Sequence, residues 1–256
     1  MLGFLRLSGK FACAAFLIAL VGDLTGTAAQ RVAILDFSST VSKPRKHPPK
    51  PFPPGTMLGG RPGGMTSGKL IVSVLSMDKS EYSPEDEINY TLEVRVAGAE
   101  TVKLPTVINL ADLEPDDPDV DLNYEAIEIW LGFFEESHER YISVPLLRLY
   151  GSEDMPWSEI ELKPGMSVEL RGKAKLKRLD PESPTDSEGR RFDAPYMGST
   201  EDLPKGEVLV SATCWRGDKF SYKGSTHFEY PGSFVPEEMS TVVYGKKITL
   251  LAVPDH

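Results

Sequence analysis

Six carboxylates fall within ten residues of one stretch, DLEPDDPDVD, which runs from residue 112 to residue 121. Calcium binds several oxygen ligands on a flexible loop, so this stretch is a candidate calcium site. The candidate ligands are Asp112, Asp116, Asp117, Asp119 and Asp121. The stretch lacks the glycine and the closing glutamate of an EF-hand, and its two prolines restrict how the chain can wrap around a cation. The alternative interpretation is a solvated acidic loop with no cofactor.

A second group of chemically capable residues forms a basic stripe. Arg171, Lys173, Lys175 and Lys177 alternate with apolar or small residues. Alternation with a period of two places all four side chains on one face of a strand. One interpretation is a docking surface for an acidic partner or an anionic polymer. The other is an exposed strand face, where lysine also discourages edge-to-edge aggregation.

Residues for catalysis are not apparent in the sequence. Neither a G-x-S-x-G elbow nor an H-E-x-x-H motif occurs, and the four histidines are scattered. Cys214 lies in VLVSATCW, in phase with Val208, Val210 and Ala212. This phase predicts a buried, small apolar side chain and not a nucleophile. We therefore expect no enzymatic activity.

The first 29 residues are typical of an export signal. A start containing Arg6 and Lys10 precedes the eleven-residue apolar run FACAAFLIALV, and small residues follow at positions 27–29. A spanning helix needs about 20 apolar residues, so no stable membrane span is expected. The prediction is a cleaved signal over residues 1–29 and a secreted or periplasmic protein. Cys13 would leave with the signal, so Cys214 could form no intramolecular disulfide.

Residues 30–69 differ in composition from the rest of the chain. They begin with the apolar RVAILDF, which could pair as an edge strand, and continue as a Pro/Gly-rich stretch that is expected to be a disordered linker. This segment carries a net charge of +6, whereas 19 basic and 36 acidic residues give residues 70–256 a net charge of −17. The basic segment could contact an anionic polymer or the acidic domain itself, or it could be a solvated linker. The acidic balance argues against nucleic acid as a partner.

Residues 70–256 read as a succession of strands with polar turns. In residues 88–96 the side chains of Ile88, Tyr90, Leu92, Val94 and Val96 alternate with polar ones, which predicts one buried face. The other expected strands are 70–77, 125–134, 140–150, 166–176, 207–215, 219–230 and 241–253. Pro145 predicts an edge or a bulge, LKPG at 162–165 predicts a turn, and Arg216-Gly217-Asp218 is expected at a hairpin tip. No window has a helical period, so the fold class is all-β, an antiparallel β-sandwich with long loops at 111–124 and 179–204.

The stretch SMDKSEYSPEDEINYTLEV resembles the start of immunoglobulin-like domains of bacterial surface proteins and of macroglobulin-type domains. The matching residues are Asp78, Lys79, Tyr82, Pro84 and Ile88, with Glu85 where glycine is usual, and the LKPG turn is also similar. The resemblance covers about thirty residues. It implies an immunoglobulin-like sandwich that mediates binding, display or inhibition, and it carries no catalytic residues.

The expected function is an exported, non-catalytic binding or structural module at the cell envelope, which recognises a protein or a polymer through its surface. An enzyme or enzyme accessory domain acting on extracellular polysaccharide is the alternative, and a secreted protease inhibitor is a further one. The sequence does not distinguish among these three functions.

Overall fold

The structure is a computed structural model of the 256-residue chain. It describes residues 29–41, 43–44, 46, 66–83, 86–117, 119–178, 196–199, 204–217, 220–223, 227–229 and 236–251. The predicted signal over 1–29, except Ala29, and most of the predicted linker lie outside these residues. Within them, no helix is long and apolar enough to cross a membrane.

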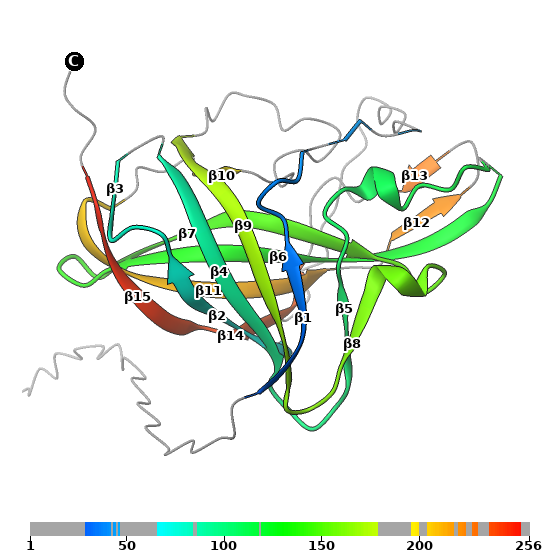
Figure 1. Cartoon of the computed structure of the whole chain (residues 1–256), viewed down its shortest axis with the longest axis horizontal. Coiled ribbons are helices and arrows are strands. Elements are labelled where there is room, and N and C mark those ends of the chain that lie inside the picture. Colours follow the sequence, from blue (N-terminus) through cyan, green and yellow to red (C-terminus); the bar gives the residue numbers. More distant parts are fainter. Residues whose placement is uncertain are drawn as a thin grey trace, which may run out of the picture.

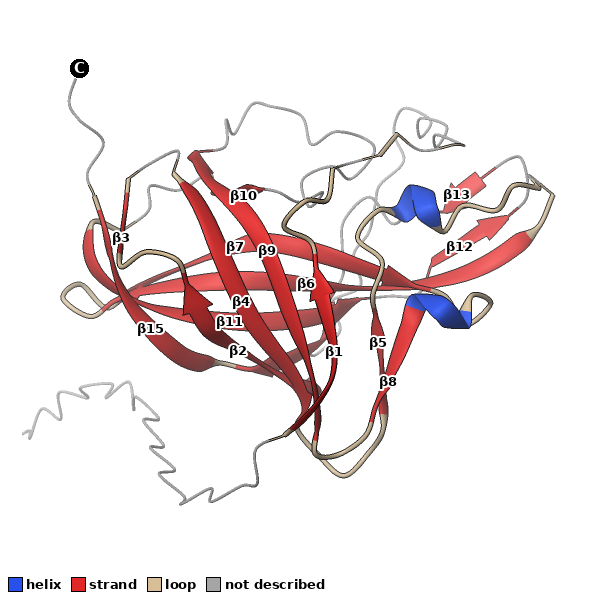
Figure 2. Cartoon of the chain, in the orientation of Figure 1, coloured by secondary structure: helices blue, strands red, loops and turns tan. Residues whose placement is uncertain are grey.

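Strands dominate the described chain, with two single-turn 3-10 helices and no α-helix among its elements (Figure 2). The first strands are β1 (Gln30–Asp36), β2 (Thr66–Met77), β3 (Glu81–Tyr82), β4 (Glu87–Val96) and β5 (Val102–Pro105). Next come η1 (Leu110–Asp112), β6 (Asp121–Glu135), β7 (Arg140–Gly151), η2 (Pro156–Ser158), β8 (Glu159–Leu162) and β9 (Met166–Arg178). The last are β10 (Tyr196–Ser199), β11 (Gly206–Gly217), β12 (Phe220–Lys223), β13 (His227–Glu229), β14 (Pro236–Thr241) and β15 (Val243–Leu250).

Thirteen strands form one sheet whose main path is β1-β9-β4-β2-β14-β11-β6-β12-β13, and β5 and β8 form a separate two-stranded ribbon. The half containing β1, β9, β4 and β2 lies across the half containing β6, β7, β11 and β15, so the sheet makes a sandwich-like arrangement (Figure 1). One apolar core contains side chains of both halves, for example Leu92 and Val168 with Phe133 and Val210. The all-β prediction is confirmed at this level.

One face of β4 is buried, as its alternating pattern predicts. Its buried residues are the five apolar ones from Ile88 to Val96, all at 9% exposure or less. Burial of one face follows from the two-residue period of a strand. Cys214 is buried in phase with its apolar neighbours, also as predicted. The LKPG turn links β8 to β9, with Met166 N–H donating to the Lys163 carbonyl at 2.9 Å and Gly165 at φ +80°.

Pro145 lies at a bulge on an edge strand. Among the described strands, β6 is the only one that pairs with β7, and the register shifts where Trp130 pairs with Pro145 while Ile129 pairs with Leu147. A proline has no N–H for the ladder, which restricts it to such positions. The prediction of an edge or a bulge is confirmed in both respects.

The prediction of a wholly antiparallel sandwich is wrong, because the sheet is mixed. Four pairings are parallel, namely β1 with β9, β10 with β9, β14 with β2 and β15 with β3. The first arises because RVAILDF, within the expected linker, pairs as an edge strand on β9. The chain also enters its first long strand at Thr66, four residues before the expected start. Local alternation is the same in parallel and antiparallel strands and so does not indicate direction.

The expected hairpin at Arg216-Gly217-Asp218 is also wrong. Arg216 pairs with Ile127 and Phe220 pairs with Tyr124, so β11 and β12 follow one another along the same side of β6. From the first pair to the second, the chain advances by four positions while β6 advances by three, so the pairing contains one extra residue. The expected strands 219–230 and 241–253 are likewise divided, into β12 and β13 and into β14 and β15.

Candidate functional site

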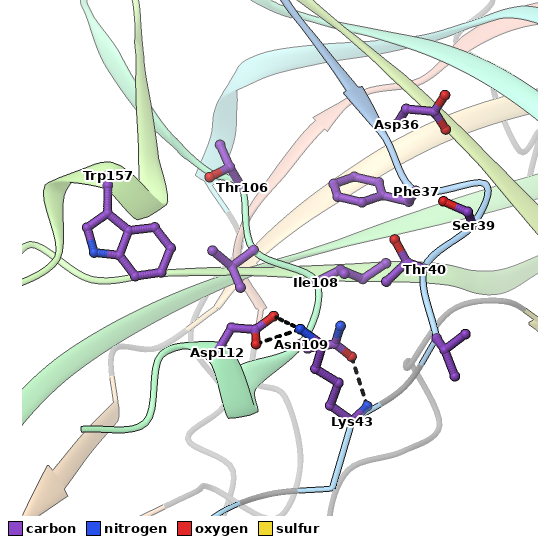
Figure 3. Close-up of a pocket in the computed structure, with 12 residues that line it drawn as sticks. Asp36, Phe37, Ser39, Thr40, Lys43, Thr106, Ile108, Asn109, Asp112 and Trp157 are labelled. Atoms are coloured by element: carbon purple, nitrogen blue, oxygen red, sulfur yellow. Dashed lines mark hydrogen bonds and ion pairs between the residues drawn. The ribbon is translucent and has the colours of Figure 1, made fainter. Parts of the chain in front are cut away.

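An open groove with a volume of about 830 Å³ lies between the segment that leaves β1 and the loop that follows β5. It is lined by Asp36, Phe37, Ser39, Thr40, Val41, Lys43, Thr106, Val107, Ile108, Asn109, Asp112 and Trp157. Figure 3 shows the Trp157 indole on one side, Phe37 and Thr40 on the other, and Ile108 between them. The lining combines apolar and aromatic surface with hydroxyl, amide and carboxylate groups, as binding sites do.

The β5–β8 ribbon places one wall of this groove. Pro105 pairs with Glu159, so the residues just after β5 lie beside those just before β8. Thr106 donates from both its N–H and its hydroxyl to the Ser158 carbonyl, at 2.9 and 2.8 Å. Val107 exchanges backbone hydrogen bonds with Tyr150 of β7. These bonds hold the chain from 106 to 108 against the sheet.

Trp157 is fixed in place by buried hydroxyls. Ser152 and Ser158 are fully buried. The Ser152 N–H donates to the Ser158 hydroxyl at 2.9 Å, and that hydroxyl donates to the Met155 carbonyl at 2.5 Å. The short helix η2 is therefore anchored on both sides of Trp157, whose side chain is 63% exposed. A large aromatic side chain held rigidly in solvent is a surface suited to binding.

The opposite wall is the segment that continues from β1. The Phe37 N–H donates to the Arg171 carbonyl of β9 at 2.7 Å, and the Phe37 side chain is 9% exposed and belongs to the core. Beyond it, the Lys43 N–H donates to Asn109 Oδ1 at 3.2 Å, and the Lys43 ammonium lies 2.9 and 3.1 Å from the two carboxylate oxygens of Asp112. An apolar contact holds one end of this wall and a charged contact holds the other.

Electrostatics favour the charged form of Asp36 at the rim of the groove. Hydrogen bonds from the Ser38 side chain and backbone, together with the charge of Arg171, keep the pKa of Asp36 below its usual value. This carboxylate is fully accessible to solvent and is ionised at neutral pH. It can accept a hydrogen bond from a ligand hydroxyl or attract a cation.

The acidic loop predicted as a calcium site is held by apolar anchors and contacts lysines. Leu110 and Leu113 pack with Tyr124 in a small second core, and the Tyr124 hydroxyl donates to the Leu113 carbonyl at 2.8 Å. Asp112 pairs with Lys43, and Asp116 lies 2.7 Å from the Lys46 ammonium. Asp117 accepts the Asp119 N–H at 2.9 Å, and Asp121 begins β6.

Among the described residues, no group of three or more potential ligands is arranged to hold a metal ion. The five proposed ligands lie in sequence along the loop without a common centre. The calcium interpretation remains a prediction, and the arrangement of Asp112 and Asp116 supports a different cation, the lysine ammonium.

The basic stripe lies on β9, as predicted, but inside the sheet. β9 has β4 on one side and β1 and β10 on the other, so protection of a free edge is not its role. Arg171 Nε donates to Glu169 at 2.6 Å, and Lys173 lies 3.1 Å from Glu87. Lys175 is exposed, and the side chain of Lys177 lies outside the described part. Arg171 and Lys173 are thus neutralised by neighbours in the sheet.

Sequence reasoning did not identify Trp157 or Phe37 as site residues. A local signal existed for Trp157, because this large apolar residue stands in the polar stretch SEDMPWSE. Nothing in the sequence related it to the segment at 37–43, more than one hundred residues away.

No protein-family model matches the sequence, and no curated protein matches it. Among solved structures, similarity is found to the sporulation control protein Spo0M from Bacillus subtilis, with 12% identity, a TM-score of 0.28 and coverage of 73% of this chain and 51% of that one. The alkylpurine DNA glycosylase AlkC from Pseudomonas fluorescens gives 8% identity, a TM-score of 0.30 and coverage of 72% and 31%. AvmM, which catalyses macrocyclization in alchivemycin A biosynthesis, gives 9% identity, a TM-score of 0.30 and coverage of 73% of this chain and 92% of that one. This chain spans about half the length of Spo0M. Similarity this weak carries no conclusion about function.

Proposed function

We propose that this chain is an exported, non-catalytic binding module of the cell envelope that holds an extended polysaccharide in the groove beside Trp157. The observation that carries the proposal is Trp157, which is 63% exposed, lines the groove and lies on a backbone anchored by hydrogen bonds on either side. The apolar C–H face of a sugar ring stacks on an aromatic face, while its hydroxyls need hydrogen-bonding groups around the rim. Ser39, Thr40 and Asp36 lie opposite the indole and supply such groups.

Export through residues 1–29 and an immunoglobulin-like form of the sandwich are parts of the same proposal. Hydrogen bonds among residues 78–89, within the stretch that resembles immunoglobulin-like domains, support the second part. Tyr82 is fully buried, its hydroxyl donates to Asp78 at 2.8 Å, and the Asn89 N–H and side-chain amide donate to the same carboxylate at 2.9 and 2.8 Å. These contacts tie together the segment between β2 and β4. They involve Asp78 and Tyr82, two residues of the stretch that resembles immunoglobulin-like domains.

The alternative is an enzyme acting on polysaccharide, which is favoured by the presence of two carboxylates, Asp36 and Asp112, in one groove. Glycoside hydrolysis needs one carboxylic acid that is protonated at working pH. Hydrogen bonds and Arg171 keep the pKa of Asp36 low, and Asp112 is paired with Lys43. Both are suited to the charged form, which supports binding over acid catalysis.

The test is retention of the purified full chain on insoluble and immobilised polysaccharides, together with an assay for released sugar. Trp157→Ala should lose at least about tenfold in affinity, because central aromatic anchors carry much of a binding energy. Tyr244→Ala is the matched control, since Tyr244 is 51% exposed and does not line the groove. Equal binding by both variants, or no retention on any polysaccharide, would contradict the proposal. Release of sugar that depends on Asp36 would establish the enzyme instead.

A further inference from the structure

Two lysines of the basic segment are held by the acidic loop in the same manner. The backbone N–H of Lys43 donates to the Asn109 side chain, and its ammonium donates to both oxygens of Asp112. The backbone N–H of Lys46 donates to the Glu114 carboxylate, and its ammonium donates to the Glu114 carbonyl at 3.3 Å and to Asp116 at 2.7 Å. Each lysine is thus recognised through both its backbone and its head group, across 66 to 70 residues of sequence.

The loop that carries the acceptors is anchored to the fold. Leu110 and Leu113 are buried against Tyr124, and the Tyr124 hydroxyl donates to the Leu113 carbonyl at 2.8 Å. Asn109 and Glu114, which accept the two backbone N–H groups, are 5% and 3% exposed with the lysine segment in place. A loop anchored in this way loses less conformational entropy on binding a peptide than a loop without such an anchor.

The ligand segment has a suitable conformation. Lys43 precedes Pro44, and a residue before proline is restricted to extended backbone. The backbone bonds hold any extended chain, and the carboxylates at Asp112 and Asp116 select the lysines.

We propose that the acidic loop from Asn109 to Asp116 is a binding site for an extended basic peptide with two lysines three residues apart, filled in cis by residues 43–46. This proposal is independent of what the groove binds. The charges agree, because residues 43–50 are basic while residues 70–256 carry a net charge of −17. The hydrogen bond and charge of Asp116 also raise the pKa of Lys46, in agreement with a formed ion pair.

The segment is bound in a way that permits displacement. The side chains of Lys43 and Lys46 are 56% and 46% exposed, and that of Asp116 is 97% exposed. Exposed ion pairs of this kind are individually weak and are screened by salt. A second basic peptide can therefore compete for the loop, and because Lys43 lines the groove, displacement removes part of one groove wall.

The experiment measures fluorescence anisotropy of a labelled peptide, TVSKPRKHPPK, which corresponds to residues 40–50. In the full chain carrying Lys43→Ala and Lys46→Ala, the tethered segment keeps its two backbone hydrogen bonds but loses both ammonium contacts. A peptide with both lysines should displace this segment and bind in low salt, and we call this variant the vacated chain. Wild-type chain should bind at least about tenfold more weakly, because its own segment competes at high effective concentration. Adding Asp112→Asn and Asp116→Asn to the vacated chain should abolish binding, as should about 0.5 M salt.

Two controls separate site recognition from general attraction to an acidic protein. Glu87→Gln in the vacated chain removes the β4 carboxylate that pairs with Lys173 and should leave peptide binding unchanged. A peptide with glutamine in place of Lys43 and Lys46 should not bind. Failure of the vacated chain to bind, or equal binding after Asp112 and Asp116 are neutralised, would overturn the proposal. Circular dichroism of each variant shows that the fold is retained.

Discussion

Charges inside the sheet and charges at the groove are paired by different means. On β9 and on β6–β7, acidic and basic side chains meet neighbours in the sheet, as with Arg171 and Glu169 or Glu128 and Arg148. At the groove, Lys43 and Lys46 meet acceptors that lie 66 to 70 residues away along the chain. The first kind of pair follows from strand register, and the second depends on the path of two separate segments.

The two kinds also differ in burial. Glu128 and Arg148 are register partners with side chains only 2% exposed, whereas the pairs at the groove are in solvent. Burial raises the pKa of Glu128, although the charge of Arg148 and its hydrogen bonds act in the opposite direction. The buried pair of Glu128 and Arg148 therefore supports the fold, and the exposed pairs at the acidic loop are available to be exchanged.

The largest expected effect comes from breaking the buried pair. Arg148→Met leaves Glu128 buried without its cation and should destabilise the fold by about 3–5 kcal/mol at pH 7. A carboxyl whose folded pKa is raised stabilises the fold relatively more as pH falls, because the folded state then binds the proton more tightly. The loss should thus be smaller at pH 5 than at pH 7 in urea unfolding. An equal loss at both pH values would contradict this.

Removing the apolar anchor of the groove wall should have the next largest effect. Phe37 is 9% exposed in the core, and Phe37→Ala should cost about 3 kcal/mol through lost burial and a cavity. Thermal unfolding measures the loss, and hydrogen exchange should show faster exchange at the Phe37 N–H, which is bonded to Arg171. If the apolar contact is the stronger anchor, the double variant Lys43→Ala with Lys46→Ala should lose less free energy of unfolding than Phe37→Ala. A larger loss from the double lysine change would reverse the assigned roles.

An exposed pair within the sheet should matter little. Lys173 and Glu87 have side chains that are 38% and 59% exposed, so Lys173→Ala should change the free energy of unfolding by less than about 0.5 kcal/mol. Chemical denaturation in low and high salt measures this change. A loss above about 1 kcal/mol would mean that the stripe has a structural role beyond local pairing.

The smallest expected effect is a change in the pKa of one side chain, Asp36. Ser38→Ala removes the largest cause of the lowered pKa of Asp36, so the pKa should rise toward 3.8. A carboxylate with a lowered pKa stabilises the fold above its unfolded pKa and loses that contribution as pH falls through the folded pKa. The stabilisation by Asp36 should therefore disappear only in acid below its ordinary value. NMR titration of the carboxyl carbon measures the change, and an unmoved pKa would assign the shift to the backbone N–H of residue 38 and to Arg171 instead.

Prediction from sequence succeeded where one residue type meets one local rule. The burial of Ile88 through Val96, the turn at Gly165, the bulge at Pro145 and the phase of Cys214 all follow from the two-residue period or from the backbone limits of proline and glycine. The Arg216-Gly217-Asp218 hairpin was wrong because a turn-forming composition also fits an interrupted strand. Pairing of β6 with both β11 and β12 favours the interrupted strand over the hairpin.

The candidate site shows the same division. The sequence alone determined that residues 112–121 are acidic, that residues 43–50 are basic, and that one strand presents basic side chains to one face. Only the tertiary structure decided that Asp112 and Asp116 meet Lys43 and Lys46, that Trp157 stands in solvent opposite Phe37, and that the basic stripe is partly neutralised in the sheet. The physical reason is that periodicity and turn preference act over a few residues. Contacts between segments instead depend on strand order and direction, which alternation does not encode.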